Sequence, residues 1–150
     1  MNGCGNMANM FNLDFSEFSA LTKRFEELED HVADIGKPTV YAGAAVIADE
    51  IRKRMEQNLK NSKYSTGDME DSFGIAKAKV LAMEINTKIG FSGYDSKGVP
   101  NQLKARAMES GTSKQAKRPF IRPALNASRE LAQEKMAVTA NQEIDKIINK

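Results

Sequence analysis

The sequence contains few of the residues on which metal, redox and disulfide chemistry depend. Among its 150 residues there is one cysteine, Cys4, and one histidine, His31. A lone cysteine excludes an intrachain disulfide and a cysteine-only metal site, and it fits a reducing compartment. His31 stands among acidic residues without the spacing of metal ligands, so we expect a surface histidine and no zinc or hydrolytic site.

Glycine-rich phosphate loops and long apolar runs are missing as well. Gly90, Gly93 and Gly98 lack the Lys-Ser/Thr sequence or helix context of a nucleotide-binding loop. No window approaches the roughly 18 apolar residues of a membrane span, and the first ten residues have no basic or apolar signal region. We therefore expect no cofactor, no small-molecule substrate and no membrane insertion, and we expect residues 1–13 to form a flexible arm.

Charge is unevenly distributed along the chain, although the net charge is only +2. Acidic residues dominate residues 14–34, whereas basic residues dominate residues 97–129, where Glu109 is the sole acid. Two solvated surfaces of opposite sign would explain this pattern. Head-to-tail stacking or ring formation between subunits would explain it too, and the sequence leaves both explanations open.

Two helices are predicted in the first 61 residues. The first begins at Asp14 as N-cap and ends at the stop signal formed by Gly36 and Pro38. Pro38 then opens a second helix that ends near Asn61. Apolar residues recur at steps of three or four in both, at Phe15, Phe18, Leu21, Phe25, Leu28, Val32 and Ile35 and then at Val40, Ala44, Ile47, Ile51, Met55 and Leu59.

The remaining elements are predicted with fewer signals. Residues 83–91 alternate apolar and polar side chains, which predicts a strand with one face on a core. Residues 75–81 are ambiguous, because their Ala and Lys residues favour helix whereas the neighbouring Phe73 and Ile75 favour strand. We expect loops at 61–68 and 92–98, a short helix from Pro100, and a last helix from about Pro123 into the 140s.

Residues 109–118 contain several residues with special backbone or charge properties, in an order that no helix or strand periodicity explains. Gly111 permits a left-handed turn, and Thr112 can hydrogen-bond the backbone locally. Lys114, Lys117 and Arg118 then place cations on a loop that should remain exposed and that we assign as an assembly interface. The loop is built for surface contact and not for catalysis.

The next residues stiffen the chain before the last helix. Pro119 and Pro123 fix their own φ angles and bias the residues before them toward extended geometry, so Phe120 should be a buried anchor. The Glu109 carboxylate can accept backbone N–H bonds beside this turn, or it can meet a cation such as Arg122. Glu109 could also be paired with Glu84 as acid and base, but nothing in the sequence fixes their separation. We assign no catalytic residue.

Two short motifs therefore stand out, one at residues 66–73 and one at residues 109–125. In this order they resemble the tail-completion or minor tail component family of long-tailed bacteriophages, over roughly residues 15–130. A family Ala-Pro pair is replaced here by residues 62–65. The matching positions are Thr66, Gly67, Ser72, Glu109, Gly111, Thr112, Pro119, Phe120, Arg122, Pro123, Ala124 and Leu125.

The resemblance implies an α+β fold, with a small antiparallel sheet packed against long N-terminal and C-terminal helices. It makes residues 75–81 a strand with a bulge and residues 14–150 a single tail-completion domain. It further implies a structural protein of the head-proximal tail end or neck of the virion, assembled in the host cytoplasm. The expected partners are further copies in a ring, preferably a hexamer, and the neighbouring neck and tail-tube proteins.

A small nucleic-acid-binding protein is the alternative function. The cations between residues 97 and 129 could neutralise phosphates, and a ring in the neck would resemble a channel through which DNA passes. Against it, Phe120 is the only aromatic residue in the basic stretch, and no helix-turn-helix, RNP or zinc pattern is present. Assembly therefore ranks above nucleic-acid binding.

Overall fold

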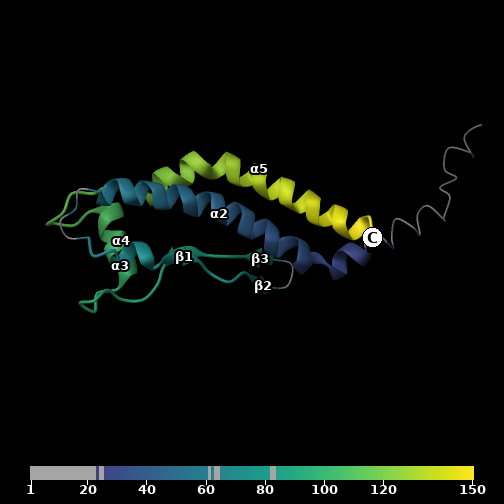
Figure 1. Ribbon diagram of the computed structural model, residues 1–150, viewed down its shortest axis with the longest axis horizontal. Coiled ribbons are helices and arrows are strands. Elements are labelled where there is room, and N and C mark those ends of the chain that lie inside the picture. Colours follow the sequence, from purple (N-terminus) through teal and green to yellow (C-terminus); the bar gives the residue numbers. More distant parts are fainter. Residues whose placement is uncertain (1–22, 24–25, 61, 63–64, 82–83) are drawn as a thin grey trace, which may run out of the picture.

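The computed structural model describes residues 23, 26–60, 62, 65–81 and 84–150. Two long helices, α2 (Val32–Leu59) and α5 (Ile121–Ile148), run antiparallel and side by side along its longest axis (Figure 1). The short helices α3 (Asp68–Asp71) and α4 (Asn101–Ser110) lie at the end where α2 finishes and α5 starts. The predicted arm at residues 1–13 and the Asp14 N-cap lie outside the described residues.

Four short strands form one interrupted hairpin beside α2 (Figure 1). Strand β1 (Phe73–Ile75) pairs antiparallel with β4 (Ile89–Phe91), and β2 (Lys79–Leu81) pairs antiparallel with β3 (Glu84–Asn86). The two registers differ by one residue, because residues 76–78 on one arm face residues 87–88 on the other. This extra residue is the bulge expected from the resemblance.

The same bulge changes the strand predicted at residues 83–91. That strand is observed as two pieces, β3 and β4, because the ladder is interrupted opposite the extra residue. Ala76 N still donates to Lys88 O at 2.7 Å, so the arms stay together across the interruption. The fold class is confirmed: two small antiparallel sheets pack against long helices in an α+β arrangement.

The predicted helix boundary at Gly36 and Pro38 is wrong. Residues 26–30 are helical, His31 lies in a turn, and α2 continues from Val32 straight through both residues. Gly36 does not end the helix. It lets α2 lie close to β3, because a Cβ at this position would overlap the Ile85 side chain.

Pro38 is tolerated in the second turn of α2 at a limited cost. It removes one helical hydrogen bond, the one to the Asp34 carbonyl. Thr39 Oγ1 donates to the Ile35 carbonyl at 2.7 Å and gives this turn an additional hydrogen bond. Packing on the hairpin therefore outweighs a local stop signal.

The core lies where α2, α3, α4, β1 and the start of α5 meet. Farther along the helix pair, α2 and α5 approach each other closely at Gly43, where a Cβ would lie 2.5 Å from Met136 Sδ. No helix in the described part of the chain is long and apolar enough to cross a membrane. The buried residues of the core are Ala48, Ile51, Met55, Met69, Phe73, Ala105, Met108, Phe120 and Ala124.

Candidate assembly interface

The basic loop, residues 111–118, connects α4 to α5 at one end of the helix pair (Figure 1). Gly111 ends α4 with φ of 75° and ψ of 173°, a conformation that only glycine adopts readily. A Cβ at Gly111 would also lie 2.9 Å from Lys117 N. The turn expected from the sequence is therefore present, and glycine is required both for its dihedral angles and for its packing.

The tip of the basic loop is a small closed turn. Thr112 N donates to Gln115 O at 2.8 Å, and Lys114 N lies 3.3 Å from Thr112 Oγ1. Lys114 and Lys117 are exposed, and neither makes an ion pair with any described residue. Their charges are thus available to a partner on a turn whose backbone is already ordered.

Arg118 differs from these two lysines. Its Nη1 donates to Asn58 O at 3.0 Å, and Asn58 Nδ2 donates back to Arg118 O at 3.0 Å. Its backbone N–H also donates to Met108 O at 2.8 Å. Arg118 therefore fastens the basic loop to the end of α2, a partner 60 residues away that no sequence spacing could reveal.

Glu109 holds the other side of the loop by capping α5. Its Oε2 accepts the N–H groups of Phe120 at 2.7 Å and Ile121 at 2.8 Å, while Oε1 accepts the N–H of Arg122 at 2.9 Å. Of the two structural roles considered for Glu109, backbone acceptance is the observed one, and no ion pair joins it to a cation among the described residues. Arg122 contributes its backbone to the cap, and its side chain is exposed.

Pro123 completes this cap because it has no N–H to satisfy. The next donor, Ala124 N, already bonds to Phe120 O at 3.2 Å, so helical bonding starts there. Helix starts leave their first N–H groups without helical partners. In α5 each of these groups is either bonded to Glu109 or absent, so none is left without a partner.

The protonation of Glu109 reflects the same contacts. Partial burial is the largest single influence and raises the pKa of this carboxyl. The backbone N–H donors of Arg122, Phe120 and Ile121, together with the nearby positive charge of Arg122, outweigh burial and hold the pKa of Glu109 below its usual value. Glu109 is therefore ionised at neutral pH, the state in which it accepts all three bonds and complements the positive end of the helix.

Phe120 anchors the start of α5 in the core. Its side chain is fully buried, as expected, and its ring meets the Phe91 ring edge-on at 6.2 Å between centroids. Phe91 in turn lies 5.0 Å from Phe73, over which the Arg52 guanidinium sits at 5.4 Å from the ring centre. The helix start is thus tied to the sheet by an edge-on aromatic contact, and the sheet is tied to α2 by the cation–π contact of Arg52.

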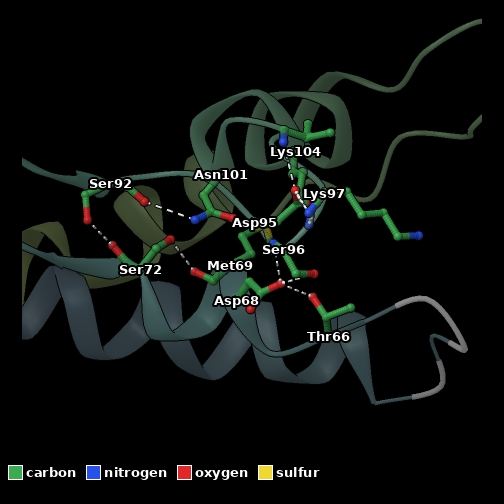
Figure 2. A network of polar contacts seen from close by, with 11 residues as sticks. Thr66, Asp68, Met69, Ser72, Ser92, Asp95, Ser96, Lys97, Asn101 and Lys104 are labelled. Atoms are coloured by element: carbon green, nitrogen blue, oxygen red, sulfur yellow. Dashed lines mark hydrogen bonds and ion pairs between the residues drawn. The ribbon is translucent and has the colours of Figure 1, made fainter.

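The upstream motif forms the short helix α3, where a loop was predicted up to residue 68. Gly67 precedes it with φ of 81°, and Thr66 Oγ1 donates to Asp68 Oδ2 at 2.6 Å. The same Asp68 oxygen lies 3.3 Å from Ser96 N, which joins α3 to the loop before α4 (Figure 2). Ser72 ends α3 and donates its hydroxyl to Met69 O at 2.8 Å.

Asp95 organises the loop that Ser96 shares with α3. Its Oδ1 accepts from Lys97 N at 2.9 Å and Val99 N at 2.8 Å, and Lys104 Nζ lies 2.5 Å from Oδ2 (Figure 2). The Lys104 contact contributes most, and with the backbone bonds it lowers the pKa of Asp95 to about 2. The sequence pattern did not single out this residue, although an Asp followed by Gly98 is typical of such a turn.

The two motifs meet around a hollow of about 520 Å³ between α2, α3, α4 and the basic loop. Thr66 and Met69 line it from the upstream motif, and Lys114 and Arg118 line it from the basic loop. Leu125 does not belong to this cluster, because it lies on α5 with 39% of its surface exposed. The structure therefore brings residues separated by about fifty positions to one end of the molecule.

The opposite end carries the opposite charge. Residues 26–34 lie beside the C-terminus, at the far end of the helix pair from the basic loop (Figure 1). Their carboxylates are exposed, and His31 Nδ1 lies 3.0 Å from Asp34 Oδ2 on this surface. No group of three metal-type side chains occurs among the residues described. The exposed acids at this end are Glu26, Glu27, Glu29, Asp30 and Asp34.

Comparison with known proteins identifies a family. The model of the HK97 gp10-like family, a family assigned to the bacteriophage tail, matches residues 19–111. The match includes the upstream motif, Glu109 and Gly111, and it ends before the lysines of the basic loop. Neither the search of curated proteins nor that of solved structures finds a significant match.

Proposed function

Because the chain belongs to the HK97 gp10-like family of bacteriophage tail components, we propose that it completes the head-proximal end of the tail or the neck. In this role it is a structural protein of the virion with no catalytic site and no bound cofactor. Residues 14–150 act as one tail-completion domain, and residues 1–13 act as an arm. It acts by binding neighbouring copies and the neck and tail-tube proteins through complementary surfaces.

The observation that carries this proposal is the firmly held basic loop. Glu109 fixes the backbone after it, Arg118 ties it to α2, and Gly111 sets the turn before it. Lys114 and Lys117 consequently project from an ordered backbone, so docking orders little additional chain and loses little entropy. An acidic surface on a neighbouring neck or tail protein is the complementary partner.

Ring formation is the second part of the proposal, with six subunits the preferred number. The basic loop and the acidic residues 26–34 lie at opposite ends of an elongated subunit (Figure 1). Surfaces that differ between the two sides of a contact form heterologous interfaces, which close into rings when the rotation permits. Mass measured by light scattering over a range of protein and salt concentrations tests this, and a strict monomer even with tail protein present would contradict it.

The test of the loop reverses Lys114 and Lys117 to Glu together and leaves Arg118 unchanged, because Arg118 holds the backbone. The matched control reverses Lys37 and Lys135, which are exposed elsewhere on α2 and α5. Both variants should fold, since exposed charges contribute little to stability. We expect the loop variant alone to yield heads and tails that fail to join in an assembly assay.

The same variants distinguish assembly from nucleic-acid binding. If the basic loop binds DNA, duplex affinity should fall steeply with salt, and the log–log slope should shrink by roughly one for each phosphate contact removed. We expect weak affinity, because the net charge is only +2. Submicromolar binding that the loop variant loses, with normal particle joining, would make nucleic-acid binding the primary function.

A further inference from the structure

An apolar groove of about 700 Å³ opens between the β1–β4 sheet, α4 and the first turn of α5. The apolar side chains of Ile75, Ile89 and Phe91 line it and remain only half-buried, although they pack against the core. Ile121 at the start of α5 borders the groove in the same half-buried state. The groove is thus an extension of the core that the chain's own described residues do not cover.

Two glycines face each other in the sheet that borders this groove. Gly74 in β1 stands directly opposite Gly90 in β4, and both line the groove. A Cβ built on either would meet nothing within 4 Å. Glycine in a strand interior weakens the strand and often marks a place where another backbone comes close. Because side chains alternate along a strand, this open space lies on the face of the sheet opposite Ile75, Ile89 and Phe91, so the glycines leave that face uncovered without adding room over the apolar floor.

The rim of the groove is positively charged. Lys88 and Arg106 line it and are both exposed. Neither side chain makes an ion pair with a described residue. Glu109 also lines the groove, but its carboxylate is occupied by the three N–H donors of α5. The groove consequently favours an apolar element that carries a carboxylate.

The β2–β3 hairpin of the same chain presents such an element. Leu81 is 59% exposed, and Val80 beside it is 42% exposed. Glu84 stands directly opposite Leu81 in the register, so the two side chains share one face of the hairpin. Leu81 and Glu84 thus offer an apolar side chain and a carboxylate on one surface, which matches the apolar floor and the basic rim of the groove.

We propose that the groove receives the β2–β3 hairpin of a second copy, with Leu81 on the apolar floor and Glu84 beside Lys88 and Arg106. This inference rests on the proposed ring and names its contact. The groove and the hairpin are different surfaces of one chain, so each copy gives its hairpin to one neighbour and receives the hairpin of another. Such a contact repeats around a ring.

A disulfide between copies tests the contact directly. In a Cys4→Ser background, one preparation carries Leu81→Cys and a second carries Ile89→Cys, on the apolar floor of the groove. Mixed under mild oxidation, they should form a disulfide joining positions 81 and 89, identified by mass spectrometry of the linked peptides. Leu131→Cys, half exposed on α5, is the matched control and should not link to position 81.

The rim pairing has its own test by charge exchange. Glu84→Arg and Arg106→Glu should each weaken self-association about tenfold, and combining them should restore most of it. Circular dichroism confirms that each variant is folded. Oligomers that form without the 81–89 link would overturn this contact and leave the ring standing, whereas a monomer under every condition would overturn both.

Discussion

The two ends of the helix pair are held in different ways. At the end with the basic loop, the start of α5 is bonded to Glu109, and the end of α2 exchanges hydrogen bonds with Arg118. At the other end, His31 precedes α2 without a side-chain cap, and Pro38 interrupts its hydrogen bonding. The first end is fixed by polar groups from distant parts of the chain, and the second by close packing.

This difference indicates that the end with the basic loop is the more rigid of the two. The end that carries Lys114 and Lys117 combines a capped helix, an aromatic cluster and a glycine-specific turn. In the α2–α5 contact, Gly43 lies close to Ala132 and to Met136, whose side chain is flexible. Substitutions should therefore cost most at the fixed end and least along the helix pair.

The largest expected effect is at Phe120. Phe120→Ala should lower the free energy of unfolding by about 3–5 kcal/mol, because it empties a fully buried site between the sheet and α5. Leu131→Ala, on the half-exposed surface of α5, should change it by no more than about 0.5 kcal/mol. Denaturant unfolding followed by circular dichroism measures both, and equal losses would remove the contrast between the two regions.

The next effect is at Glu109. Glu109→Gln keeps the shape of the side chain and removes its charge, so the three N–H groups of α5 lose a charged acceptor at a cost of about 1.5–3 kcal/mol. Because folding lowers the pKa of Glu109, its contribution is complete above the unfolded pKa of about 4.3. It is lost as the pH falls through the lower folded pKa.

Unfolding of both proteins between neutral and acidic pH checks this sign. The wild-type advantage over Glu109→Gln should be constant near neutral pH and shrink in acid. An advantage that stayed constant through the acid range would show that the carboxylate charge does not stabilise α5.

The smallest effects are expected at two glycines, one at each of the two compared regions. Gly111→Ala should cost about 1–3 kcal/mol, because its dihedral angles suit only glycine and backbone atoms of Lys117 block a Cβ. Gly43→Ala should change stability by less than about 1 kcal/mol, because alanine favours a helix and the Met136 side chain can move aside. Thermal unfolding ranks the two, and a reversed order would show that the helix pair is the more rigid region.

The sequence alone was sufficient for features that depend on neighbouring residues. The apolar spacing predicted the part of α2 from Pro38 onward and its buried face, including Ile51 and Met55, and the prolines beside Phe120 predicted a buried anchor. The two short motifs by themselves indicated a phage tail family, and the family match confirms that assignment. The helix and the buried anchor follow from local periodicity and backbone restriction, which act over a few residues, whereas the family follows from the resemblance of the two motifs.

Tertiary structure decided what depends on residues far apart in the chain. The sequence predicts a helix stop at Gly36, yet α2 continues through it because Ile85 of the hairpin packs there. The sequence predicts that Arg118 is an exposed cation like Lys114 and Lys117, yet it is hydrogen-bonded to Asn58 at the end of α2. Local signals state what a segment can adopt, and the contacts that each segment gains from distant partners select among those possibilities.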